Sequence, residues 1–275
     1  MQDAPAEYGV VGHPVSHSLS PFIHGLFAQS TAQNMSYRLH DVHPDNLHTF
    51  LMDFWRRGGR GLNVTVPHKI SASGMVRAMS ERATRAGAVN TLLMDEDGIS
   101  GDNTDGAGLV RDLTVNLKVV LQGSRILLVG SGGAACGVIA PLLDESPEQI
   151  VIAGRTAARA ETLARQFDSR GAVRGCGLAA IAPGTFDIVI NATSAGLAGE
   201  IPAIPASVIH PDTFCYDMSY ARAGTAFLTW ARTQGAERTA QGWGMLVEQA
   251  AESFELWRGV RPSTEPVLAA LLAGS

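Results

Sequence analysis

The sequence predicts an α/β fold of two domains: an N-terminal α/β domain, and a Rossmann-type doubly wound parallel sheet whose closing helices return to the first domain. Three observations predict it. Short apolar runs alternate with helical patterns along the chain, a glycine-rich stretch separates a strand from a helix near residue 130, and the last two helical stretches have no strands of their own. A chain of 275 residues fits two domains of ordinary size. We expect residues 1–105 plus 243–275 to form the first and 106–242 the second.

The first half alternates between strand and helix patterns. Strands are expected at 8–12, 37–42 and 62–66, and helices at 21–31 and 45–57, with more helix between 67 and 85. Ser20 is expected to cap the first helix, with Pro21 at its first position. The runs 89–94 and 99–102 flank the turn signal Asp97-Gly98, which predicts a hairpin, and a helix is expected after Asp105.

The second half reads as a parallel sheet with helices between its strands. Strands are expected at 125–129, 150–153, 188–191 and 214–216, with a last strand at 238–242. The two closing helices are expected at 245–256 and 265–272. Because they have no strands to cover within their own segment, we expect them to pack on the first domain.

Composition narrows the class of protein. The formal charge of −5 gives no basic field for nucleic acid. Cys136, Cys176 and Cys215 lack a C-x-x-C spacing, and the histidines show no convincing ligand set, so no metal site is expected. No signal peptide and no membrane span are apparent, which leads us to expect a cytoplasmic monomer or homodimer that binds a small molecule.

A dinucleotide-binding turn is predicted directly after the strand at 125–129. It matches the G-x-G-x-x-A pattern and comprises Gly130, Ser131, Gly132, Gly133 and Ala134. Glycines let the backbone approach a pyrophosphate, and the helix N-terminus offers free N–H groups to it. The alternative is a tight strand-to-helix turn that binds nothing.

The end of the next strand indicates which dinucleotide binds. NAD enzymes usually carry an acid there, whereas this chain has Gly154, Arg155, Thr156 and, one helical turn on, Arg159. Arginine forks and a hydroxyl suit the 2′-phosphate of NADP. The sequence therefore predicts NADP, against the alternative that Arg159 is only a charge on a solvated helix face.

Lysine is rare in this chain, which draws attention to Lys69. Of the 21 basic residues only Lys69 and Lys118 are lysines. Arginine cannot release its proton near neutral pH, whereas a partly buried lysine can, so a retained lysine is a candidate for proton transfer. We accept chance retention on the surface for Lys118. Lys69 differs from Lys118 because it follows the end of a predicted strand that carries the polar residues Asn63 and Thr65 on one face.

Six short segments occur in an order that resembles the shikimate dehydrogenase family from about residue 8 to residue 271. They are H-S-x-S-P at 17–21, N-V-T-V-P-x-K at 63–69, G-A-V-N-T at 87–91, G-D-N-T-D-G at 101–106, N-A-T-S at 191–194 and Y-D-M-x-Y at 216–220. Each is weak alone, and the ordered set is specific. The resemblance implies reduction of 3-dehydroshikimate to shikimate with NADPH, in aromatic amino-acid biosynthesis, by a substrate-binding first domain and an NADP-binding second domain.

The resemblance also implies residue roles. Ser18 and Ser20 would hold the substrate carboxylate, while the ring oxygens would be held by Thr65, Lys69, Asn90, Asp105 and Gln249, with Tyr220 beside them. Thr193, Met218 and Gly242 would flank the nicotinamide, and Glu81 is a further candidate there. Lys69 and Asp105 would be catalytic, the ammonium stabilising the developing alkoxide and delivering its proton.

Some positions depart from the family pattern, and three alternatives stay open. Gly154 stands where an asparagine is usual, His13 where an asparagine is common, and Ser219 where a bulkier residue is common; Ala135-Cys136 replaces a more polar pair. The alternatives are a quinate/shikimate dehydrogenase of broader specificity, a non-catalytic NADP-binding paralogue, and an unrelated two-domain dehydrogenase. Closure between the domains is expected if substrate and cofactor bind to different ones.

Overall fold

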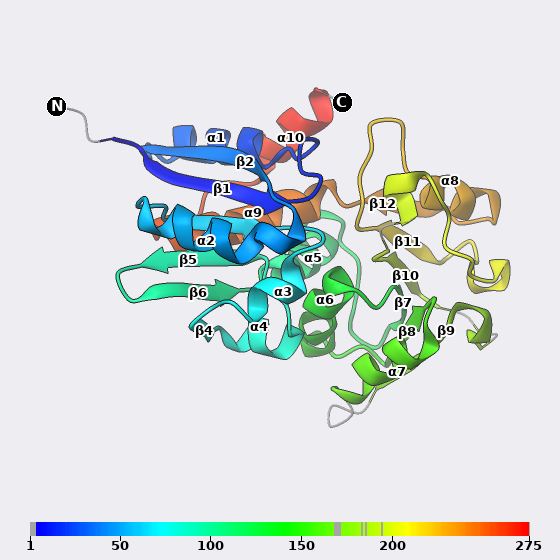
Figure 1. Cartoon of the computed structure of the whole chain (residues 1–275). Helices are drawn as coiled ribbons and strands as arrows, with labels where there is room; N and C mark the ends of the chain where they lie inside the picture. Colours follow the sequence, from blue (N-terminus) through cyan, green and yellow to red (C-terminus); the bar gives the residue numbers. More distant parts are fainter. Residues whose placement is uncertain (1–3, 168–171, 183, 185, 194, 275) are drawn as a thin grey trace. The chain divides into compact units, whose positions relative to one another are not determined.

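A computed structural model describes residues 4–167, 172–182, 184, 186–193 and 195–274, and it divides into two compact units. Unit 1 comprises Met1–Gly108 and Leu246–Ser275, and unit 2 comprises Leu109–Met245 (Figure 1). The chain thus leaves unit 1 within one helix and returns within another. The boundaries expected from the sequence lie three residues before these crossings (105 against 108, and 243 against 246).

Unit 1 is built on a mixed sheet of six strands in the order β2-β1-β3-β5-β6-β4. Its strands are β1 (Ala6–Gly12), β2 (Met35–Asp41), β3 (Gly61–Val64), β4 (Ala78–Met79), β5 (Thr91–Asp95) and β6 (Gly98–Asp102). The predicted hairpin is β5 and β6, which makes β5 antiparallel to both of its neighbours, β3 and β6. The other pairings are parallel, so β1, β3 and β6 end at the same edge.

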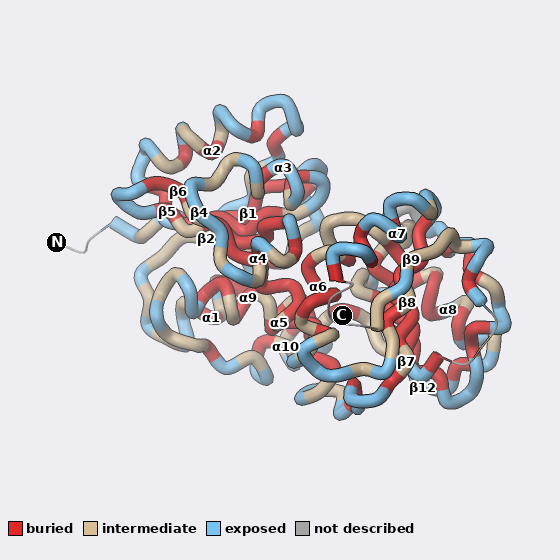
Figure 2. Tube along the Cα trace, turned by 90° about the horizontal axis from the view of Figure 1, so that it is seen from below, coloured by how far each residue is buried: buried red, intermediate tan, exposed pale blue. Residues whose placement is uncertain are grey.

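Helices cover both faces of this sheet. One hydrophobic cluster joins α1 (Ser20–Ser30), α9 (Trp243–Arg258) and α10 (Glu265–Ala273), as expected for closing helices that pack on the first domain. Another joins the sheet to α2 (Leu47–Arg56), α3 (Lys69–Ser73) and α4 (Glu81–Ala86). The remaining short element before α2 is a 3-10 turn, η1 (Pro44–Asn46). Figure 2 shows the buried segments of these elements gathered along the strands.

Unit 2 has an entirely parallel sheet of six strands in the order β12-β11-β10-β7-β8-β9. The strands are β7 (Arg125–Val129), β8 (Gln149–Gly154), β9 (Val173–Gly177), β10 (Ile188–Asn191), β11 (Phe214–Asp217) and β12 (Arg238–Gln241). This is the doubly wound Rossmann arrangement, and the strand order reverses between β7 and β10. Ligands of such sheets bind outside the carboxyl ends of the strands at that switch point.

Two clusters of apolar side chains sandwich the second sheet. One contains residues of α5 (Asp105–Arg111), the π-helical turn η2 (Asp112–Asn116), α6 (Gly133–Asp144) and α7 (Ala157–Arg165). The other contains α8 (Ala226–Thr233) together with residues from the 3-10 turn η6 (Ala206–Val208) and the loops around it. Two further 3-10 turns are η4 (Leu178–Ala180) and η5 (Ala195–Ala198).

The predicted fold class is confirmed, and three local expectations are wrong. Ser20 is not the cap of α1: the N-cap is Leu19, and Ser20 is the first helical residue, whose backbone N–H donates to Ser18 Oγ. The stretch 67–85 is not continuous helix but α3, the short strand β4 and α4. The strand β9 was not expected; its sequence Val-Arg-Gly-Cys-Gly has low strand propensity, and it forms at a sheet edge because β8 offers it a partner.

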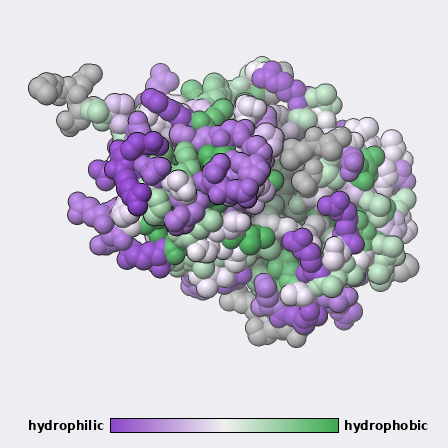
Figure 3. Space-filling view, in the orientation of Figure 1, coloured by the Kyte–Doolittle hydropathy of each residue, from purple (hydrophilic) through white to green (hydrophobic). Residues whose placement is uncertain are grey.

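The face of the molecule in Figure 3 carries both hydrophilic and hydrophobic residues, with the most hydrophilic ones gathered mainly on the left of the view. The most exposed large hydrophobic residue among those described is Val120, at 75%. No helix in the described ranges combines the length and apolar character needed to cross a bilayer.

Candidate active site

Lys69 and Asp105 form a close ion pair in unit 1. Lys69 is the first residue of α3, directly after the loop that follows β3, and Asp105 is the first residue of α5. The Lys69 Nζ donates to Asp105 Oδ2 at 2.5 Å, and the two side chains are only 14% and 5% exposed. The ammonium therefore has a close carboxylate partner, and the Lys69 side chain stays partly accessible. The structure thus brings together the two predicted catalytic residues.

Asn90 holds the other oxygen of that carboxylate. Its Nδ2 donates to Asp105 Oδ1 at 2.9 Å and lies 3.4 Å from Gln249 Oε1 on α9. Its Oδ1 accepts the backbone N–H of Thr104 at 2.8 Å, which fixes which end of the amide faces Asp105. Four of the predicted substrate residues, listed in chain order, therefore lie in one bonded group: Lys69, Asn90, Asp105 and Gln249.

The two predicted carboxylate-binding serines lie together before and at the start of α1. Ser18 Oγ donates to Ser20 Oγ at 3.1 Å, and the Ser20 backbone N–H donates to Ser18 Oγ at 3.3 Å. Hydroxyls grouped at a helix N-terminus suit an anion. Thr65 lies after β3 and is partly exposed, and its methyl group packs against Gly12 at the end of β1.

The glycine-rich turn of unit 2 has the form a dinucleotide pyrophosphate requires. Gly130 has φ of +124°, a conformation that L side chains rarely adopt, and a Cβ there would lie 2.9 Å from the Ala192 carbonyl oxygen after β10. Above Gly132 there is open space, since a Cβ there would meet nothing within 4 Å. The first turn of α6 carries no acid. The turn therefore lies at the β7/β10 switch point, and residues 131–134 are partly exposed there.

The end of β8 fits a phosphate on the adenosine ribose. Arg155, Thr156 and Arg159 are exposed, and neither guanidinium has an ion pair with another described residue. Thr156 is the N-cap of α7, yet its side chain makes no capping hydrogen bond. A Cβ on Gly154 would lie 2.9 Å from Ser131 Oγ, so the β8 end and the glycine turn adjoin. Two free cations, a free hydroxyl and a helix N-terminus form a suitable set for a phosphate.

The residues predicted to flank the nicotinamide follow the carboxyl ends of three strands: Thr193 follows β10, Met218 follows β11 and Gly242 follows β12. Gly242 and Met218 are in contact, because a Cβ on Gly242 would lie 2.4 Å from the Met218 carbonyl oxygen. Thr193 donates from its N–H and its hydroxyl to Asn191 Oδ1, at 3.1 and 2.7 Å. Ser194, the last residue of the Asn-Ala-Thr-Ser motif, lies outside the described residues.

Two residues that the sequence analysis did not single out order this region. Asn191 Nδ2 donates to Asp217 Oδ1 at 3.2 Å, and the same oxygen accepts the Ser219 N–H at 3.0 Å. Both residues are fully buried, and burial raises the pKa of Asp217. Their presence in the 191–194 and 216–220 motifs was the available signal, but the motifs do not say which strand ends pair.

Family comparison agrees with this geometry. Residues 10–92 match the shikimate dehydrogenase substrate binding domain, residues 113–198 match the shikimate / quinate 5-dehydrogenase model, and residues 242–272 match the shikimate 5'-dehydrogenase C-terminal domain. A shikimate dehydrogenase (NADP(+)) of Methylococcus capsulatus is 52% identical over 270 residues, 98% of this chain and 97% of the relative. The chain belongs to the shikimate dehydrogenase family.

Solved structures of similar proteins share the whole fold. An Ael1 enzyme from Pseudomonas putida has a TM-score of 0.90 at 42% identity, covering 97% of this chain and 98% of that one. Shikimate 5-dehydrogenase from Thermus thermophilus, in complex with NADP(H) and shikimate, has a TM-score of 0.86 at 32% identity, covering 98% of this chain and 100% of that one. The shikimate dehydrogenase family fold therefore extends over both units.

Two of the expected family positions are not joined to the groups above. Tyr220 belongs to unit 2, where its ring lies 4.6 Å from that of Trp243, and burial raises the pKa of Tyr220. Glu81 is an exposed residue in the first turn of α4 in unit 1. Their contacts to substrate and nicotinamide stay predictions.

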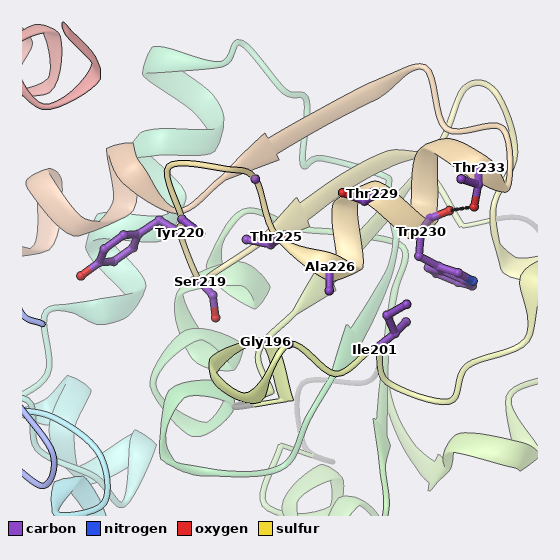
Figure 4. Close-up of a pocket in the computed structure, with 12 residues that line it drawn as sticks. Gly196, Ile201, Ser219, Tyr220, Thr225, Ala226, Thr229, Trp230 and Thr233 are labelled. Carbon is purple, nitrogen blue, oxygen red and sulfur yellow. Dashed lines mark hydrogen bonds between the residues drawn. The ribbon is translucent and has the colours of Figure 1, made fainter. Parts of the chain in front are cut away.

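A cavity of about 610 Å³ adjoins the Ser219–Tyr220 loop within unit 2. Ile201, Ala226 and Trp230 give it a mainly apolar lining, and Figure 4 shows the Tyr220 ring directed away from these residues. Among the described residues no group of three histidines, cysteines or acids is arranged to hold a metal ion.

Proposed function

We propose that this chain interconverts 3-dehydroshikimate and shikimate with NADP(H), as its family relatives are named to do. The proposal rests chiefly on the ion pair between Lys69 Nζ and Asp105 Oδ2, which are 2.5 Å apart. Asn90 donates a hydrogen bond to the other oxygen of that carboxylate. Reduction of a ketone builds negative charge on the ketone oxygen, and an ammonium held in place beside that oxygen stabilises the charge. We further propose the first unit as the substrate domain and the second as the NADP domain.

The chemistry at the ketone assigns distinct tasks to the two catalytic residues. When bound, NADPH supplies the hydride. As negative charge builds on the ketone oxygen, the Lys69 ammonium stabilises it and transfers one N–H proton to it, leaving a neutral amine and a hydroxyl. Asp105 holds the Lys69 nitrogen in place and accepts a hydrogen bond from the same substrate hydroxyl. In the oxidation of shikimate each of these steps is reversed.

The substrate's orientation would follow from groups at two ends of the unit 1 site. Ser18 and Ser20 would donate to the carboxylate, while Thr65, Asn90 and Gln249 would bond the ring hydroxyls, and Tyr220 is proposed as a further substrate-binding residue. Two hydroxyl donors at a helix N-terminus favour an anion over a neutral group. A polyol that lacks the carboxylate should therefore bind poorly.

Selection of NADP would rest on Arg155, Thr156 and Arg159. Their exposed donors would hold the 2′-phosphate, and the glycine turn, including Ser131, Gly133 and Ala134, would receive the pyrophosphate. Thr193, Met218 and Gly242 would flank the nicotinamide. With Gly154 in place of asparagine, adenosine loses one side-chain contact, so we expect discrimination between NADP and NAD to depend on the arginines.

The test is the appearance of NADPH from shikimate and NADP by the purified protein. Shikimate should be oxidised with NADP far faster than with NAD, and quinate should be a poor substrate. Comparable rates with quinate, or a preference for NAD, would favour the broader quinate/shikimate alternative. Absence of turnover together with retained NADP binding would favour a non-catalytic paralogue. We also propose that the enzyme acts in the cytoplasm as a monomer or homodimer, which light scattering distinguishes.

A further inference from the structure

Three buried polar residues precede Asp105 in the Gly-Asp-Asn-Thr-Asp-Gly segment, and the proposed reaction gives them no task. Asp102 ends β6, and Asn103 and Thr104 connect it to α5, whose first residue is Asp105. Their exposed fractions are 6%, 2% and 0%. Buried polar side chains are normally hydrogen-bonded, so their partners indicate what they hold in place.

The Asn103 side chain lies between two segments of the unit 1 site. Its Oδ1 accepts the backbone N–H of Asp105 at 3.1 Å, and its Nδ2 donates to the Ala88 carbonyl oxygen at 2.9 Å. A backbone N–H can only donate and a carbonyl can only accept, so the two contacts assign both ends of the amide. Ala88 belongs to the Gly-Ala-Val-Asn-Thr segment that carries Asn90. Asn103 therefore cross-links the segments that supply Asn90 and Asp105.

The backbone N–H of Asp105 depends on this contact. The first four N–H groups of a helix have no acceptor within the helix, and Asp105 is the first residue of α5. Asp105 is 4% exposed, which leaves little room for water, and Asn103 Oδ1 is the acceptor that this N–H has in the described part of the chain. Without Asn103, a buried donor would be left unpaired unless the start of α5 moved, and an unpaired buried donor is costly.

Asn90 and Lys69 hold the opposite end of Asp105. They bond its carboxylate oxygens, at 2.9 Å from Asn90 Nδ2 and 2.5 Å from Lys69 Nζ. Asn90 Oδ1 also accepts the Thr104 N–H, so the loop keeps an anchor when Asn103 is lost. The ion pair would then stay bonded but shift together with the start of the helix. A shift of about 1 Å between reacting groups can slow a reaction about a hundredfold, so a smaller shift suits a tenfold loss.

Asn103 is itself anchored through its backbone. Its N–H donates to Asp102 Oδ1 at 2.6 Å, and Arg82 on α4 donates to both oxygens of that carboxylate, from Nε at 2.6 Å and Nη2 at 3.0 Å. Burial alone would raise the pKa of Asp102, but hydrogen bonds from Arg82 and Ser80 outweigh it, and the pKa is lowered. The Asn103 amide is therefore attached to a charged, bidentate pair and not to a loose loop.

We propose that Asn103 is a positioning residue for the catalytic Asp105: its amide fixes the start of α5 against the segment that carries Asn90. The inference rests on the proposed function and deepens it, because it names the residue that holds the backbone end of the Lys69–Asp105 pair. It predicts a larger effect on kcat than on KM, since the alignment of the reacting groups changes while all the proposed substrate-binding side chains remain.

The test compares Asn103→Ala with Asn103→Ser. Alanine removes both amide contacts, whereas a serine hydroxyl can accept the N–H two residues on and so restores the acceptor for Asp105 without replacing the bond to Ala88. In the oxidation of shikimate, Asn103→Ala should lower kcat about tenfold and raise KM by less than about threefold, and Asn103→Ser should keep kcat within about threefold of the unmodified protein.

Gln33→Ala is the matched control. Gln33 is another unit 1 amide that bonds a different element, accepting from Arg258 Nε at 2.7 Å. Its loss should leave kcat and KM within about twofold. If Asn103→Ala does not fold, Asn103→Gln replaces it in every comparison, because it keeps both functional groups but displaces them by one methylene.

A double-mutant cycle with Asp105→Asn separates positioning from a general structural effect. In the Asp105→Asn background, Asn103→Ala should lower the residual kcat by less than about threefold, because the carboxylate that it positions is gone. An equal tenfold loss in both backgrounds, an unchanged kcat in Asn103→Ala, or a serine variant no better than alanine would each overturn the inference. The unmodified protein is assayed first, and its failure to oxidise shikimate would reject the proposed function and this inference with it.

Discussion

The two units prepare their proposed binding sites in different ways. In unit 1 the catalytic side chains are buried and bonded to one another, with Lys69, Asp105 and Asn90 held at 2.5 and 2.9 Å. In unit 2 the side chains proposed to read the cofactor, Arg155 and Arg159, are exposed and unpaired among the described residues. The comparison indicates that a catalytic site has its side chains hydrogen-bonded in place before the substrate binds. A site for a highly charged ligand instead relies on unpaired arginines and on exposed backbone N–H groups.

The difference has a physical basis in what each ligand brings. A ketone is neutral, so the protein must supply charge in a fixed position before the reaction begins. A phosphate brings its own charge and can order flexible arginines as it binds. The unit 2 backbone nevertheless has positions that only glycine fits, at Gly130 with its positive φ and at Gly242, where a Cβ would collide with the Met218 carbonyl oxygen.

The largest effect should come from removing the amine of the preorganised site. Lys69→Ala should lower kcat by at least about a thousandfold, because general acid catalysis and charge stabilisation are lost together. Shikimate binding, measured by calorimetry, should weaken far less. Turnover close to that of the unmodified protein would remove Lys69 from the mechanism.

Removing the exposed arginines of unit 2 should weaken the binding of NADP without slowing the catalytic step. The double change Arg155→Ala and Arg159→Ala should raise the KM for NADP about a hundredfold and leave the KM for NAD nearly unchanged, since charged hydrogen bonds to the 2′-phosphate are lost. Arg165→Ala, an exposed arginine at the other end of α7, is the control. Equal losses with both cofactors would mean that these arginines do not read the phosphate.

Burial of His24 in unit 1 should appear in the pH dependence of stability. Its pKa is about 3 in the folded protein against 6.5 unfolded, so below pH 6.5 the unfolded chain takes up a proton that the folded chain does not. Stability is therefore lost as the pH falls, by up to about 1.4 kcal/mol per pH unit from this residue. His24→Phe should flatten the slope of the unfolding free energy between pH 6.5 and about 4, measured with urea.

Buried His68 and half-buried His40, whose pKa values are also lowered mainly by burial, should leave a residual slope. His43→Phe offers a control, because that ring is exposed. An identical slope in His24→Phe and the unmodified protein would show that His24 is not the buried neutral imidazole described here.

The smallest effect should come from the second lysine. Lys118 is exposed in unit 2, with φ of +55°. Lys118→Arg should leave kcat and both KM values within about twofold, since surface charge is retained and no catalytic group is touched. A large loss of activity would contradict the interpretation that Lys69 is the lysine used for proton transfer and that Lys118 has no catalytic role.

The sequence located much of the fold because strong local patterns agreed with tertiary packing. The strands at 125–129 and 188–191 form as expected, since residues 126–129 and 188–190 are continuous apolar runs buried on both faces. The hairpin around Gly98 also forms as expected. By contrast, β4 and β9 are edge strands that form because a neighbouring strand supplies their hydrogen bonds, and no local sequence pattern predicts either of them.

The candidate site divides in the same way. Motifs identified Lys69, Asp105 and Asn90, and the geometry joins them. No motif identified Tyr37, whose hydroxyl donates to Asn63 Oδ1, and the expected cap role of Ser20 was wrong because Ser20 is already the first helical residue, with Leu19 as the N-cap.

By itself the sequence determined which chemical groups are present and roughly where each strand ends, because residue identity and hydrophobic period are local properties. Only the tertiary structure decided which groups are hydrogen-bonded to each other. Lys69 donates to Asp105, Asn191 donates to Asp217, and Tyr37 donates to Asn63. Hydrogen bonds depend on distances of a few tenths of an ångström between segments far apart in the chain, and those distances are fixed only when the strands and helices pack.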